Sequence, residues 1–138
     1  MSDPFDLEKF VTAQDAVWPR VTAELTAGHK QSHWMWFVFP QIAGLGMSAT
    51  SVRYAIPNVA TAKAYLKHPT LGSRLDEATR LALRHAHKTA EQIFGSIDAV
   101  KFRSSMTLFE AAGGLPIFAD ALAAFYGGER DPETLRRI

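Results

Sequence analysis

The spacing of apolar residues along this chain of 138 residues is that of helices. Apolar residues recur every three or four positions through residues 7–25 and 75–94, whereas the two-residue alternation typical of strands is nearly absent. Prolines and glycines divide the sequence into segments of helical length, with no repeat or long linker between them. We therefore predict an all-α fold, a single globular domain over residues 1–138 built as a compact bundle of about five to seven helices.

Capping residues and helix breakers set the expected boundaries. A first helix should follow Asp3-Pro4 and end at Gly28. Within it, Pro19 should cause either a kink or a break near Trp18. Further helices are expected over residues 58–66, 75–94, 98–112 (capped by Asp98) and 116–126, with a short one after Asp131-Pro132.

Charge balance and the lack of cysteine exclude several classes of function. Fifteen basic and fourteen acidic residues give a net charge of +1, so nucleic acid is not an expected partner. Without cysteine, the chain has no disulfide, thiolate nucleophile or cysteine-bound metal. Its acidic start does not resemble a signal peptide, and its longest apolar run is far shorter than the ~20 residues of a membrane span. We expect a cytoplasmic protein that contacts no membrane.

The run from His33 to Gln41, HWMWFVFPQ, concentrates two tryptophans and two phenylalanines in nine positions. Such a surface is either buried or binds something, because large exposed apolar patches are rare on soluble monomers. Periodicity leaves open whether residues 34–39 form a helix or a buried strand. In a ligand pocket, Trp34 or Trp36 would stack on a planar group, Gln41 would add a contact, and His33 would carry protons. Alternatively, the tryptophans belong to the hydrophobic core.

Lys101 has an unusual position on the helix expected over residues 98–112. A helical wheel places Lys101 within the apolar arc, while Arg103 and Thr107 fall on the opposite, solvent side. A lysine in such an arc either extends to the rim or points into a cavity. In a cavity it would bind an anion together with Ser104 and Ser105.

Two segments before residue 55 are further candidate ligand contacts. Glycines at 44 and 46 would let the backbone approach a ligand, although the loop matches no phosphate-binding motif and an ordinary loop is the alternative. The hydroxyl-rich residues 48–51, followed by Arg53 and Tyr54, can cap a helix or contact phosphate. The histidines lack the spacing of a helical metal site, so we expect no metal and no cofactor. No nucleophile elbow or carboxylate pair indicates a known hydrolase.

The segment KQSHWMWFVFPQ at residues 30–41 and the GLG at 44–46 belong to a longer pattern. It continues through YAI at 54–56, AYL at 64–66, HP at 68–69, LG at 71–72, RL at 74–75, Asp98, KF at 101–102 and SSMTLF at 104–109. This pattern resembles a bacterial family called domain of unknown function 1810, or Rv1873-like. The resemblance covers almost the whole chain and implies a small, compact, mainly α-helical protein without an established activity.

The residues LGSRL at 71–75 and KF at 101–102 also show a fainter similarity to the NADAR family. That family acts on ADP-ribose or phosphoribosyl N-glycosides, and no catalytic residue carries over from it. Two functions therefore stay open. The chain is either an enzyme or binding protein for a nucleotide-like or ADP-ribose-like small molecule, which it binds or hydrolyses, or a non-catalytic helical interaction or structural domain. In both cases we expect a monomer or a homodimer.

Overall fold

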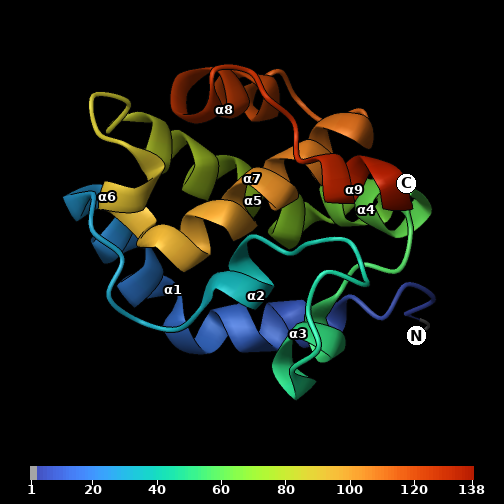
Figure 1. Ribbon diagram of the computed structural model, residues 1–138. Coiled ribbons are helices and arrows are strands. Elements are labelled where there is room, and N and C mark those ends of the chain that lie inside the picture. Colours follow the sequence, from blue (N-terminus) through green and yellow to red (C-terminus); the bar gives the residue numbers. More distant parts are fainter. Residues whose placement is uncertain (1–2) are drawn as a thin grey trace.

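The computed structural model describes residues 3–138, and every regular element in that part of the chain is a helix (Figure 1). The all-α prediction is confirmed. Short helices in the aromatic run and at residues 49–54 and 90–94 raise the number above the predicted range. Within residues 3–138 the helices are α1 (Glu8–Ala27), α2 (Met35–Val38), α3 (Ala49–Tyr54), α4 (Val59–Lys67), α5 (Pro69–Leu83), α6 (Ala90–Phe94), α7 (Ser96–Ala111), α8 (Ile117–Tyr126) and α9 (Pro132–Arg137).

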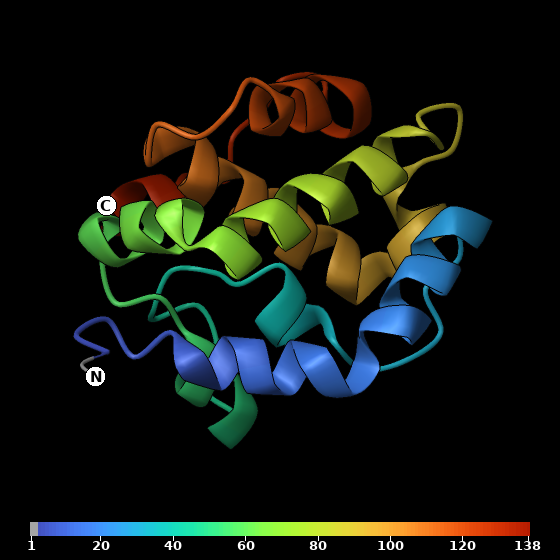
Figure 2. The same ribbon diagram turned by 180° about the vertical axis from the view of Figure 1, so that it is seen from behind.

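The three longest helices, α1, α5 and α7, form the frame of the molecule. Helix α5 packs against α1 and α8, and α7 packs against α6, α8 and α9. Figure 1 shows α1 and α8 on opposite sides, and the view from behind shows α5 between them (Figure 2). Aromatic rings fill the interior: Phe39 meets Phe102 edge to face with ring centroids 4.9 Å apart, and Phe94 stacks on Phe102 at 4.6 Å.

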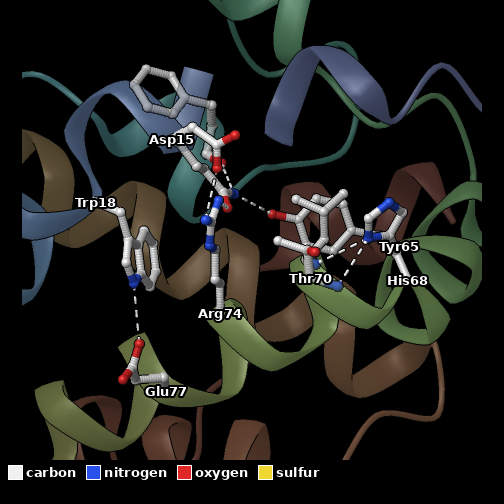
Figure 3. A network of polar contacts seen from close by, with 10 residues as sticks. Asp15, Trp18, Tyr65, His68, Thr70, Arg74 and Glu77 are labelled. Atoms are coloured by element: carbon white, nitrogen blue, oxygen red, sulfur yellow. Dashed lines mark hydrogen bonds and ion pairs between the residues drawn. The ribbon is translucent and has the colours of Figure 1, made fainter. Parts of the chain in front are cut away.

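Polar side chains add a second set of contacts between α1 and α5 (Figure 3). Arg74 of α5 reaches the Asp15 carboxylate at 2.7 Å, and its guanidinium lies 5.2 Å from the Trp18 ring. The Trp18 indole N–H in turn donates to Glu77 at 3.2 Å. These contacts surround the middle of α1, which continues unbroken through Pro19. A break near Trp18, one of the two alternatives that the sequence left open, is therefore wrong, and Glu8–Ala27 is one helix.

Capping residues mark the start or the end of three helices at the positions that the sequence predicted. Gly28 closes α1 in the left-handed conformation, with φ 72°. The Asn58 side chain accepts from the backbone N–H of Thr61 at 2.9 Å, and Asp131 caps α9 through the N–H of Thr134. These three helix ends are confirmed.

The helix expected over residues 75–94 is wrong in both its start and its continuity. It begins at Pro69, because the His68 ring nitrogen accepts from two backbone N–H groups at 3.2 Å and caps α5 there. It ends at Leu83, and a turn leads to α6, which starts at a capping box formed by Thr89 and Gln92. The capping residues therefore override the apolar stripe that made residues 75–94 look continuous.

Candidate functional site

A groove of about 860 Å³ lies between the segment that follows α2 and the first half of α7. Residues 41–48 and helix α3 line one wall, Ser96 to Ser104 of α7 line the other, and Asp131 and Glu133 of the α9 segment complete it. Figure 1 shows the segment after α2 passing α7 and α9 before it turns into α3. The volume falls in the range of small-molecule sites, roughly 300–1,000 Å³.

Backbone contacts hold the first wall of the groove in place. The Ile56 N–H donates to the Gln41 carbonyl and the Ala43 N–H to the Ile56 carbonyl, both at 2.8 Å. Ile42 and Ile56 form an isolated parallel bridge, and both side chains are buried. Ser48 then starts α3 by accepting from the N–H of Ser51 at 3.1 Å. The hydroxyl-rich run is thus a helix cap, one of the two roles it allowed.

Trp36 and Lys101 meet in this groove from opposite walls. The Lys101 ammonium lies 4.1 Å from the centroid of the Trp36 ring, within the range of a cation–π contact. The same ammonium lies 3.4 Å from the Asp98 carboxylate. The lysine side chain is 21% exposed, so it lies on the groove wall and still reaches solvent. Lys101 therefore combines the two alternatives that the sequence left open, because it lines the groove and also extends to its solvent-exposed rim.

Other predicted ligand contacts line the same groove. The Tyr54 ring packs against Phe37 at a centroid distance of 5.3 Å and so stands fixed at the wall. The Ser104 hydroxyl donates to Asp131 at 2.7 Å. In all, the groove brings together Trp36, Gln41, Tyr54, Lys101 and Ser104.

Four predicted site residues lie outside the groove. His33 is exposed in the turn before α2, and Arg53 is exposed on α3 with its guanidinium 5.5 Å from the Tyr54 ring. Ser105 is fully buried in α7, and its hydroxyl has no hydrogen-bond partner among residues 3–138. Trp34 is only 1% exposed and belongs to the hydrophobic core. The core alternative thus holds for Trp34.

Glu24, which no sequence pattern selected, organises the turn before α2. Its carboxylate accepts the backbone N–H groups of Gln31 and Ser32 at 2.8 and 3.0 Å, the Ser32 hydroxyl, and the Trp34 indole N–H at 3.0 Å. Burial raises the pKa of Glu24, but these hydrogen bonds outweigh it and lower the pKa to about 2. The ionised carboxylate therefore holds the Trp34 side chain in place, two residues before Trp36.

Lys30 and Asp98 form a second arrangement that the sequence did not reveal. The Lys30 ammonium lies 2.7 Å from the Asp98 carboxylate and 4.9 Å from the Trp34 ring centroid, with its side chain only 5% exposed. We expected Asp98 to cap its helix, and this is wrong, because α7 already begins at Ser96. Asp98 instead joins Lys30 to Lys101.

Asp131 fastens α9 to α7 beside the groove. Its carboxylate accepts the hydroxyls of Ser104 and Thr134, and its backbone N–H donates to Thr107 at 2.9 Å. Burial raises the pKa of Asp131, but hydrogen bonds, led by that of the Thr134 hydroxyl, lower it overall. Thr107 is fully buried, so its predicted solvent position is wrong, whereas Arg103 is 27% exposed and donates to two carbonyls before α9. The reason is that α9 and the segment before it cover this side of α7.

Neither a metal-binding cluster nor a membrane-spanning helix occurs among residues 3–138. Among residues 3–138, no group of three histidine, aspartate or glutamate side chains gathers as a metal site requires. Across the same residues, no helix has the length and apolar character to span a membrane.

The fold and the site define the class of this protein: it is an all-α protein with a ligand-sized groove along one of its long helices. The chain belongs to the family described as "Protein of unknown function (DUF1810)", whose model matches residues 4–138. It is similar to the crystal structure of the conserved hypothetical protein Rv1873 from Mycobacterium tuberculosis, with 49% identity and a TM-score of 0.95. That match covers 97% of this chain and 96% of the other. Among curated proteins, none matches significantly.

Proposed function

We propose that this protein binds a small organic molecule in the groove, with a planar part against Trp36 and Tyr54 and an acidic group at Lys101. The observation that carries the proposal is the contact of the Lys101 ammonium with the Trp36 ring at 4.1 Å inside a ligand-sized space. An ammonium beside an aromatic ring offers a charge-assisted hydrogen bond and an apolar surface in one place. Nucleotide-like molecules combine both features and form one class within this proposal.

Polar groups on the groove wall would orient such a ligand. Gln41 offers an amide, Tyr54 a phenol and Ser96 a hydroxyl, and all three line the groove. A few directional groups in a largely apolar lining are typical of small-molecule sites. They supply specificity for a ligand held mainly by its apolar part.

The proposal is for binding rather than hydrolysis. His33, expected as the proton carrier, is exposed outside the groove. Of the two carboxylates that line the groove, Asp131 is engaged as the cap of α9 and Glu133 pairs with Arg136 and Arg137 of the same helix. The groove thus favours a ligand-binding protein over an enzyme that needs a free acid or base.

A non-catalytic interaction domain is the second candidate. It is favoured by four exposed aliphatic side chains along the rim of the groove, an apolar surface that another macromolecule could cover. These side chains are Met47, Val52, Ile97 and Val100.

Intrinsic tryptophan fluorescence tests the small-molecule proposal. The protein is titrated to millimolar concentration with AMP, ADP-ribose, NAD, 2-naphthoate and decanoate. We expect at least one of them to quench or shift the emission, with the response lost in Trp36→Phe and kept in Trp18→Phe. Trp18 is a matched control because it lies in the α1–α5 contact, away from the groove lining. If no compound changes the emission, the proposal is wrong.

A further inference from the structure

The charges next to the groove do not balance. Asp98 is paired with two ammonium groups, that of Lys30 at 2.7 Å and that of Lys101 at 3.4 Å. Lys30 is the closer and the more buried of the two, and it also donates to the Ser32 carbonyl. Because one carboxylate neutralises one ammonium, this cluster carries one positive charge in excess, which faces the groove at Lys101.

The neighbouring charged groups leave this excess in place. On α9, the carboxylates of Asp131 and Glu133 are matched in number by Arg136 and Arg137, both of which pair with Glu133. Glu24 is also ionised, but among the described residues no ion pair joins its carboxylate to Lys30 or Lys101, and it lies outside the groove lining. Lys101 is therefore the one groove-lining cation of the described residues, and a ligand can supply its missing counter-charge.

Aliphatic side chains flank this charge on both walls. Ile97 and Val100 project from α7 within one turn of Lys101 and are 73% and 63% exposed. Met47 and Val52 of the other wall are 96% and 63% exposed. An apolar ligand body lying between them would remove this surface from water, which is favourable in proportion to the area covered.

We propose that the ligand is an amphiphilic monoanion, with one acidic group at Lys101 and a hydrocarbon or aryl body between the four aliphatic side chains. This inference rests on the proposed function, because it names the ligand class of the same groove. One acidic group matches the one excess charge. A second would approach the carboxylates of Asp131 and Glu133, so a nucleoside polyphosphate fits the groove less well than a monoanion.

Lys30 should affect the preference of the groove for an anion, although it does not line the groove. In Lys30→Met, Asp98 keeps Lys101 as its only ammonium partner, so the cluster becomes neutral. The preference for an anion should then fall even though every groove-lining residue is unchanged. Ile97→Glu reaches the same neutrality from an exposed position and leaves the buried Lys30 in place.

The test uses the fluorescence of bound 8-anilinonaphthalene-1-sulfonate and its displacement by decanoate or by decanol, which has the same chain without the charge. In the wild type, decanoate should displace the dye about tenfold better than decanol, as a single charge-assisted contact implies. This preference should disappear in Lys101→Met, Lys30→Met and Ile97→Glu. It should persist in Arg20→Met, which removes an exposed cation of α1 outside the groove. Circular dichroism confirms that each variant is folded.

The outcomes separate the two proposals. If neither amphiphile displaces the dye and none of the compounds binds by tryptophan fluorescence, the proposed function itself fails. If decanol binds as well as decanoate, or ADP displaces the dye better than decanoate, the groove binds ligands but not the proposed class. If Ile97→Glu and Lys30→Met both keep the preference for decanoate, the excess charge at Lys101 is not its cause and the inference is overturned.

Discussion

Trp34 and Trp36 stand two residues apart and have different physical roles. Trp34 is 1% exposed, with its indole N–H bonded to Glu24 and its ring in the hydrophobic core. Trp36 is half-buried, and its ring faces the Lys101 ammonium in the groove. A change at Trp34 should therefore act on stability, and a change at Trp36 on binding.

Alanine substitutions at the two tryptophans should separate these roles. Trp34→Ala removes a buried aromatic side chain and should lower the free energy of unfolding by about 3–5 kcal/mol. Trp36→Ala should lower it by only about 1 kcal/mol, because its ring already contacts solvent. Urea denaturation followed by circular dichroism measures both values. Equal losses would show that Trp36 is also a core residue.

Glu24 should give the protein a pH-dependent stability. Its pKa is about 2 in the folded protein against an ordinary 4.5, so its stabilisation is complete above pH 4.5 and is lost as the pH falls from 4.5 toward 2. Glu24→Gln should lower the free energy of unfolding by about 1–2 kcal/mol at pH 7, and the difference from the wild type should shrink at pH 3. Glu129→Gln, at a side chain that is 79% exposed, is the control and should change little. A constant difference between pH 7 and pH 3 would contradict this role for the carboxylate.

At the scale of elements, the junction of α4 and α5 brings the backbones of two helices into close contact. His68 ends α4 and caps α5, which turns the chain sharply between the two helices. Gly72 lies one turn into α5, where an added Cβ would stand 2.2 Å from the carbonyl oxygen of Leu66. Because that oxygen belongs to the backbone of α4, the contact cannot be relieved by a side-chain movement.

Gly72→Ala should therefore destabilise the protein despite the better helix propensity of alanine. Overpacking of this kind lowers stability by about 1–3 kcal/mol, more than the ~1 kcal/mol that alanine gains in a helix. Ser73→Ala is the matched control, because Ser73 is the next residue of α5 and is exposed. We expect a lower midpoint of thermal unfolding for Gly72→Ala and an unchanged or higher one for Ser73→Ala. A midpoint for Gly72→Ala equal to that of the wild type would contradict this, because it would mean that α4 and α5 move apart to admit the added methyl group at little cost in stability.

The helices themselves were largely predictable, because their ends depend on local residues. Gly28, Asn58 and Asp131 cap helices where the sequence placed them. It was less predictable which side of each helix faces solvent, since this depends on which other segments of the chain pack against that helix. On α7 the helical wheel placed Lys101 correctly near the interior, yet it placed Thr107 in solvent, because α9, distant in sequence, covers that side.

At the scale of the whole molecule, the site depends on contacts between distant segments. The sequence suggested Trp36, Gln41, Tyr54, Lys101 and Ser104 as ligand contacts, and the fold brings them to one groove. It could not show that Lys30 pairs with Asp98 across 68 positions, because neither residue stands out from ordinary surface charges. It also could not place His33, since the turn that exposes this residue is fixed by Glu24 from α1.

The indole N–H signals of the three tryptophans test the central claim, that the groove beside Trp36 binds an anionic amphiphile. In a two-dimensional ¹H–¹⁵N NMR spectrum each tryptophan reports a different place: Trp18 the α1–α5 contact, Trp34 the core, and Trp36 the groove. On titration with decanoate we predict that the Trp36 signal shifts and saturates, while those of Trp18 and Trp34 stay in place. A Trp36 signal that does not move, or one that moves only together with Trp18, would contradict the claim.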